Sequence, residues 1–149
     1  MKKIHEGKKT ILIFTIFKIL DPIWYGMFFC ALIFDFVYFF NYDVSWSKTS
    51  SWLLLIGLFI AIIPRLINLY WVCIVWKKSK ISLVHLDFFL NFFAIISAVI
   101  NCFVHGRDAF AIAPDNIIFS SLTVLLLVVA KIVESHLIIG KSYVFKYFQ

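Results

Sequence analysis

The chain has 149 residues, of which 63% are hydrophobic and 15% charged, and its mean hydropathy is +0.98. Soluble domains are about 45–50% apolar, so the composition excludes a soluble globular protein and indicates a single polytopic membrane domain over residues 1–149. The net charge of +6 does not indicate nucleic-acid binding, because no basic stripe with interleaved aromatic residues is present. Cys30, Cys73 and Cys102 lie apart in apolar runs, which is typical of buried small side chains rather than of a disulfide framework.

Five apolar segments follow one another along the chain. Residues 10–20 are too short to cross a bilayer, and they predict an N-terminal interfacial helix that leads into the first span. The four longer segments are each long enough to span a membrane, and they cover residues 22–40, 52–76, 81–104 and 114–139. Short polar linkers make sequential helices antiparallel neighbours, so we expect an all-α, up-down, four-helix transmembrane bundle.

Lysine and arginine are distributed unequally between the two sides of this bundle. Five of the 14 precede the first span, three lie in the 77–80 linker and two follow the fourth span. Only Lys48 and Arg107 lie on the opposite side. Basic residues favour the cytoplasmic side of a membrane, so we expect both termini in the cytoplasm.

Each predicted span carries one stripe of small and polar residues when it is projected at 100° per residue. Helices in membranes pack through such stripes, because lipid already accommodates apolar side chains. The stripes, in chain order, contain Ala31, Asp35 and Tyr38; Gly57, Ala61, Pro64, Arg65 and Asn68; Asp87, Asn91, Ala94, Ala98 and Asn101; and Ser120, Thr123, Leu127, Lys131 and Glu134.

Charged residues on these stripes predict a polar interior. Arg65 lies in the middle of the second span, where a guanidinium is costly unless it faces protein or water. Counted from the cytoplasmic ends, Arg65 is about 16 Å deep and Asp35 about 20 Å, so we expect these two to pair. Lys131 is expected to bridge to Asp87, with Glu134 one turn away.

The predicted network therefore contains Arg65, Asp35, Asp87, Lys131 and Glu134, with Asn68 and Asn91 beside them. These charges either neutralise one another and fix helix register, or line an ion or proton path.

The histidines raise the question of a haem or metal site. His85 and His136 are predicted on the same membrane side at similar depth, as axial haem ligands would be, although both project away from the polar stripes. Asp21 and Asp87 with His136 would form a mixed metal site. His105 is expected to be solvated in the linker of residues 105–113. No catalytic motif is present, and no serine or threonine in the predicted spans has a neighbouring base, so the sequence does not predict an enzyme.

Four short patches, over roughly residues 20–145, resemble the DUF2231 family of small four-span bacterial membrane proteins, whose role is largely undefined. They are similar to the family's His-Pro, P-G-L-I-D-Y, H-x-L-L-N and G-G-H-L motifs. The patches, in chain order, are Asp21-Pro22, Ile63-Pro64-Arg65-Leu66-Ile67-Asn68-Leu69-Tyr70, Asp87-Phe88-Phe89-Leu90-Asn91 and Glu134-Ser135-His136-Leu137. The acidic residue of the family's first helix is matched by Asp35.

This chain departs from the family pattern at its polar positions. Asp21 and Asp87 stand where the family has histidine, Arg65 where it has glycine and Asn68 where it has aspartate. If the family's histidines hold haem or metal, the resemblance implies that most of that ligand set is missing here.

We therefore expect a non-catalytic structural or accessory component of a bacterial inner-membrane complex, without a cofactor. Its expected partners are the lipid bilayer and either other membrane subunits or further copies of the chain, and not nucleic acid. Two alternatives remain open: a haem b electron-transfer bundle that uses His85 and His136, and an ion- or proton-coupled carrier that uses the buried charges.

Overall fold

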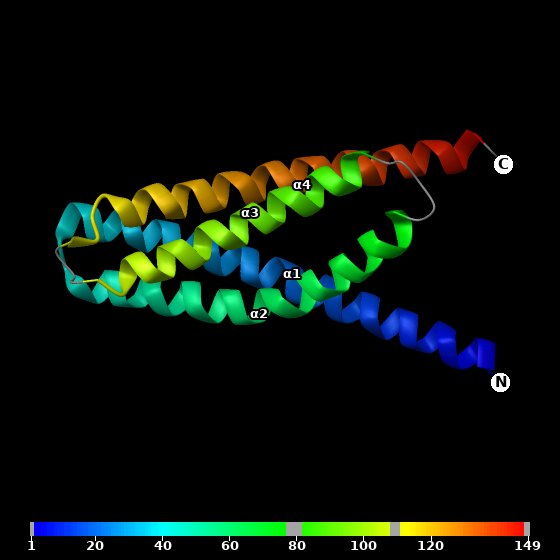
Figure 1. The fold of residues 1–149 in the computed structure, drawn as a ribbon, viewed down its shortest axis with the longest axis horizontal. Coiled ribbons are helices and arrows are strands. Elements are labelled where there is room, and N and C mark those ends of the chain that lie inside the picture. The colour runs from blue at the N-terminus through cyan, green and yellow to red at the C-terminus, as the bar shows by residue number, and fades with distance from the viewer. Residues whose placement is uncertain (1, 77–81, 108–110, 148–149) are drawn as a thin grey trace.

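The computed structural model describes residues 2–76, 82–107 and 111–147, so the predicted 77–80 linker and part of the 105–113 linker lie outside the described residues. The described chain forms four helices (Figure 1): α1 (Lys2–Asn41), α2 (Val44–Trp76), α3 (Ser82–His105) and α4 (Asp115–Tyr147). Each contains a segment long and apolar enough to cross a membrane, namely Thr15–Asn41, Val44–Tyr70, His85–His105 and Asp115–His136. The predicted all-α four-helix bundle is confirmed.

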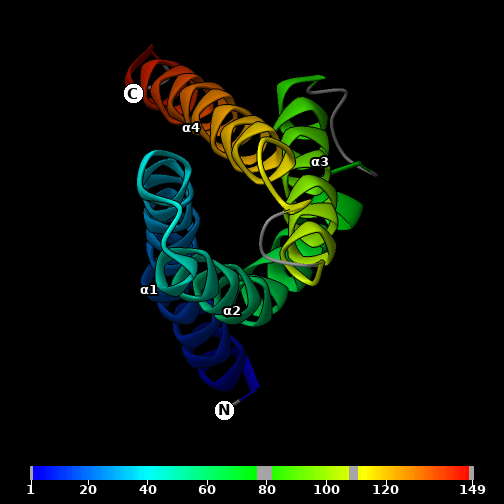
Figure 2. The ribbon, with the colours of Figure 1, turned by 90° about the vertical axis from the view of Figure 1, so that its left-hand side faces the viewer.

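The helices follow one another around the bundle in chain order (Figure 2). α1 packs most extensively on α2, and α3 on α4, while fewer contacts join α2 to α3 and α1 to α4. The start of α1 and the end of α4 lie at one end of the bundle, which we call the terminal end (Figure 1). The α1–α2 turn, the end of α3 and the start of α4 lie at the other end, which we call the distal end.

α1 differs from the sequence expectation at its N-terminal half. Residues 10–20 are helical as predicted, but they are continuous with the first span rather than a separate helix. Pro22 lies inside α1 and does not begin a new helix. A proline removes one backbone hydrogen bond from a helix, and membrane helices tolerate this loss where neighbouring groups compensate.

The turn between α1 and α2 is much shorter than the predicted linker. Tyr42 adopts a left-handed conformation with φ of 54°, and its N–H donates to the Tyr38 carbonyl at 2.7 Å, which ends α1. Asp43 then caps α2, because its Oδ1 accepts the N–H of Ser45 at 2.9 Å. This backbone hydrogen bond holds the pKa of Asp43 below its ordinary value. α2 therefore begins at Val44, eight residues before the predicted Trp52.

The predicted stripes form the interior of the bundle. Ala31, Ala61, Ala94 and Ala98 are buried at the helix contacts and surround larger side chains that include Phe28. Small residues allow close approach of backbones in the absence of a hydrophobic driving force from lipid. Many large apolar side chains on the outer faces are exposed, and a bilayer would cover them.

Candidate functional site

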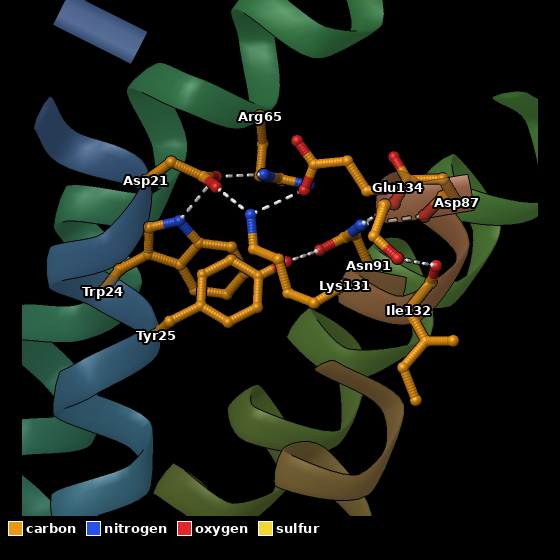
Figure 3. Close-up of polar contacts among 10 residues, drawn as sticks. Asp21, Trp24, Tyr25, Arg65, Asp87, Asn91, Lys131, Ile132 and Glu134 are labelled. Atoms are coloured by element: carbon orange, nitrogen blue, oxygen red, sulfur yellow. Dashed lines mark hydrogen bonds and ion pairs between the residues drawn. The ribbon is translucent and has the colours of Figure 1, made fainter. Parts of the chain in front are cut away.

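One group of charged side chains lies toward the terminal end, and we call Asp21, Arg65, Lys131 and Glu134 the ionic centre (Figure 3). Asp21 is 4% exposed and lies at its middle. Asp21 Oδ1 accepts from Arg65 Nη2 at 2.5 Å, and Asp21 Oδ2 accepts from Lys131 Nζ at 2.5 Å. Trp24 Nε1 donates to Asp21 Oδ1 at 3.2 Å, and Lys131 Nζ also donates to Glu134 Oε2 at 2.7 Å. One carboxylate thus joins α1 to α2 and α4.

The expected pairing of Arg65 with Asp35 is wrong, and the helical hairpin explains why. Asp21 lies 22 residues before Asp43 and Arg65 lies 22 residues after it. A tight turn centred at Asp43 therefore sets these two residues opposite each other on antiparallel helices. The sequence prediction began the first span at Pro22 and placed the linker at residues 41–51, and both errors shifted the register toward Asp35.

Aromatic and amide side chains surround the ionic centre. The guanidinium of Arg65 lies 4.9 Å from the centroid of the Trp24 ring, and Lys131 Nζ lies 4.5 Å from that of Tyr25. These are cation–π distances. Tyr25 also donates its hydroxyl to Asn91 Oδ1 at 2.6 Å, which connects α1 to α3.

Asp87 is not bridged by Lys131 as expected. Asn91 Nδ2 donates to Asp87 Oδ1 at 3.0 Å, and Asn68 also hydrogen-bonds this carboxylate. Lys131 reaches Asp21 instead, because the register of α1 brings that carboxylate to within 2.5 Å. Of the residues in the predicted network, Asp35 is the one that lies away from the ionic centre. Trp24 and Tyr25 were not predicted as neighbours of the charges, although both lie within one turn of Asp21.

A second polar group lies toward the distal end, and we call Asp35, Ser47, His105, Asn116 and Ser120 the distal cluster. Asp35 is fully buried, and its Oδ2 accepts the hydroxyl of Ser120. Its Oδ1 accepts Asn116 Nδ2 at 3.3 Å and lies 3.1 Å from His105 Nε2. The contact with His105 has ion-pair distance but is not aligned as a hydrogen bond.

The expectation that His105 is solvated is wrong, because its side chain is 0% exposed. α3 continues through residue 105, which places His105 one turn beyond the buried Asn101 and on the same face. The four-residue spacing from Asn101 was the signal that would have extended the polar stripe of this helix. His105 Nδ1 lies 3.4 Å from Ser47 Oγ, so a serine of α2 does have a neighbouring base. The sequence missed this pair because it placed both residues in linkers.

The predicted haem or metal residues are dispersed. His136 is exposed on α4, His85 is partly exposed on α3, and Asp21 is engaged by Arg65, Lys131 and Trp24. Among the described residues no group of three or more His, Cys, Asp or Glu side chains gathers as a metal site.

Comparison with known proteins gives one finding. No curated protein and no solved structure matches the chain. A family model described as a predicted membrane protein, DUF2231, matches residues 21–147. This range contains both polar groups, the first span from Asp21 onward and the other three spans in full. The chain therefore belongs to the DUF2231 family of predicted membrane proteins.

Proposed function

We propose that the protein is a structural component of a membrane assembly, and that its ionic centre locks the bundle and is not a transport or redox site. The observation that supports this proposal is the sharing of Asp21 by three donors, Arg65, Lys131 and Trp24. The side chains of Arg65 and Asp21 are 15% and 6% exposed, so these charges meet each other rather than solvent.

Charge pairing of this kind favours one helix arrangement over others. A buried pair adds little net stability, but removing one partner leaves an uncompensated charge and costs about 3–5 kcal/mol. Any register shift of α1 against α2 would impose that penalty on Arg65. The link from Tyr25 to Asn91 extends the constraint to α3, so the four helices are positioned by one set of contacts.

The outer surface supports a role within an assembly. A 520 Å³ groove runs along the outside between α2 and α3, and apolar residues such as Phe59, Leu66 and Phe92 line it beside Arg65. A groove of this shape fits a membrane helix of another subunit or of a second copy. The bias of Lys and Arg toward the terminal end supports a cytoplasmic location of both termini and an inner-membrane assembly.

The two alternatives have less support from the geometry. A bis-histidine haem needs both imidazoles to face a common space, whereas His136 is exposed on α4. A carrier needs charges that water or substrate reaches and that alternate between partners. Lys131 is 41% exposed, but Asp21 is occupied by both cations at once.

The test is purification of the tagged full-length chain in mild detergent, with Arg65→Met and the surface variant Lys48→Met as a matched pair. We expect a colourless protein that co-purifies stoichiometrically with other membrane subunits, and we expect only Arg65→Met to reduce that recovery. A Soret band in the absorption spectrum would replace this proposal with the haem alternative. An active monomer whose ion uptake into proteoliposomes is abolished by Arg65→Met would replace it with the carrier.

A further inference from the structure

The distal cluster opens onto a pocket that the structural role does not use. The pocket has a volume of 270 Å³ and lies between the start of α2 and the end of α3. Its polar lining comprises Ser47, Ser51, Lys48, His105 and Arg107. Unlike the apolar groove between α2 and α3, it joins hydroxyl groups, an imidazole and two cationic side chains at the end of the bundle.

Two side chains that line this pocket and one buried behind them follow one another as nucleophile, base and carboxylate. Ser47 Oγ lies 3.4 Å from His105 Nδ1, and His105 Nε2 lies 3.1 Å from Asp35 Oδ1. They come from α2, α3 and α1, so only the folded bundle brings them together. Catalytic hydrogen bonds in structures without substrate are often long or poorly aligned and tighten when substrate binds. A serine, a base and an orienting carboxylate define the constellation of nucleophilic hydrolases on unrelated folds.

We propose that Ser47, His105 and Asp35 form a catalytic triad that hydrolyses a carboxylic ester of an anionic amphiphile at the membrane surface. The proposal goes beyond the structural role of the ionic centre. The two regions are separate, because Asp21 and Asp35 are 14 residues apart on α1, or about 21 Å along the helix.

The chemistry follows from the order of the three groups. With the imidazole proton on Nε2 toward the Asp35 carboxylate, Nδ1 carries the lone pair that faces Ser47. Ser47 Oγ attacks the ester carbonyl carbon while its proton passes to His105 Nδ1. The carbon–oxygen bond to the alcohol then breaks, and the alcohol leaves with that proton. Water attacks the acyl-serine through the same base, releases the carboxylic acid and restores Ser47.

Asp35 is a positioning residue in this scheme. The Ser120 hydroxyl and Asn116 Nδ2 hold its two oxygens, so the carboxylate cannot rotate away from the imidazole without losing both bonds. Asn101 Nδ2 in turn donates to Ser120 Oγ at 2.7 Å. This second layer of hydrogen bonds holds the carboxylate beside Nε2 of the imidazole, where a carboxylate favours the tautomer that the triad needs.

The lining of the pocket indicates the class of substrate. Lys48 and Arg107 line it together with Ser47. Arg107 Nη1 also lies 3.1 Å from Asp115 Oδ2, so the positive charge that favours a substrate with an anionic group close to the ester comes mainly from Lys48. Positive charge beside the nucleophile also stabilises the oxyanion that forms during acyl transfer. Trp52 lines the same pocket, is 64% exposed and is suited to a membrane–water interface, where an amphiphilic ester would reside.

A fluorophosphonate probe on the full-length protein in detergent micelles tests the proposal. The probe phosphonylates an activated serine and releases fluoride. We expect one adduct, which tandem mass spectrometry places on Ser47 in the tryptic peptide that ends at Lys48. Ser47→Ala should abolish it, and His105→Gln should slow labelling by about 10²–10⁴-fold, the usual contribution of a general base. Ser45→Ala is the matched control, because Ser45 is exposed on the same helix, lies in the same tryptic peptide and is not part of the pocket lining, and its labelling should stay within about two-fold.

Three results would overturn the triad: an unlabelled wild-type protein, an adduct on Ser45 or Ser51, or undiminished labelling of Ser47→Ala. The first is what a protonated His105 predicts, since an imidazolium paired with Asp35 would donate to Ser47 and leave it unreactive. Mapping the wild-type adduct does not depend on whether any variant folds. Hydrolysis of p-nitrophenyl butyrate gives a second readout. Asp35→Asn should lower kcat per serine that the fluorophosphonate labels at completion, whereas a merely structural loss would lower the number of labelled serines and leave kcat per labelled serine at the wild-type value.

Discussion

The ionic centre and the distal cluster each bury one aspartate of α1, but they stabilise it in different ways. Asp21 receives two cationic side chains and an indole N–H. Asp35 receives a hydroxyl and an amide and lies beside an imidazole. The charge of Asp21 is thus balanced by two cationic side chains, whereas Asp35 is surrounded by neutral groups and by an imidazole that can be neutral.

This difference suggests that the ionic centre has a structural role and the distal cluster a chemical one. The guanidinium of Arg65 is always charged and Lys131 lies between two carboxylates, so the ionic centre is a lasting lock whose members have little freedom to react. Histidine changes its protonation near neutral pH, and serine is a nucleophile once a base faces it. The reactive combination thus lies where neither a lysine nor an arginine pairs with the buried aspartate, beside a pocket at the end of the bundle.

The strongest test of the comparison is Asp21→Asn. This change leaves Arg65 and Lys131 without their shared carboxylate inside the bundle. We expect the free energy of unfolding to fall by about 3–5 kcal/mol, measured by titration with sodium dodecyl sulfate in mixed micelles. The double variant Asp21→Leu with Arg65→Met should recover much of this loss, because Lys131 keeps Glu134. A loss below about 1 kcal/mol for Asp21→Asn would show that water already screens the ionic centre.

The helix contact between the two polar groups gives the second test. A Cβ at Gly57 would lie 2.8 Å from Cε1 of the buried Phe28 ring and 3.3 Å from Met27 Cβ. Gly57→Ala should therefore separate α1 from α2 and cost about 1–3 kcal/mol in the same titration. Gly26→Ala is the matched control, since nothing lies within 4 Å of its added methyl group, and it should be neutral or slightly stabilising. Equal effects of the two changes would contradict a tight α1–α2 contact.

The sequence predicted four membrane-spanning helices, because span length and apolar composition are local properties. It did not predict which charged side chains pair with one another. Asp21 was placed at the edge of the first span, although it is the centre of the charge network. Finding it required the position of the Asp43 cap, since a turn shifted by a few residues changes every opposing pair on the hairpin. His105 and Ser47 were assigned to linkers for the same reason, so their proximity depended on helix ends that composition does not define.

Asp35→Asn provides the third test and should have a smaller effect than Asp21→Asn. An asparagine oxygen still accepts from Ser120, and no fixed cation is left unpaired, so we expect a loss of about 1–2 kcal/mol in mixed micelles. A loss equal to that of Asp21→Asn would show that His105 is a buried cation and would remove the contrast between the two regions. The result also bears on the triad, which needs a neutral imidazole beside this carboxylate.

The smallest effect is expected at Asp43, where the cap of α2 sets the register that brings Asp21 to Arg65. The N–H of Ser45 holds the pKa of Asp43 in the folded protein below its value in the unfolded chain, which is about 3.9. The order of these two pKa values sets the direction in which stability changes with pH. The stabilisation is complete above the unfolded pKa and is lost as the pH falls through the lower, folded pKa. Asp43→Asn retains a side-chain cap and should flatten this acid dependence below about pH 5 without unfolding the hairpin. Asp43→Ala removes the cap at every pH and should lower stability at neutral pH as well. Both changes are measured as the difference from wild type at each pH, which cancels the contribution of the other carboxylates.

If Asp43→Asn kept the wild-type acid dependence, the hydrogen bond to Ser45 would not favour the ionised carboxylate. If Asp43→Ala instead cost as much as Asp21→Asn, the turn and the ionic centre would form one cooperative unit, because the shifted register would separate Arg65 from its partner.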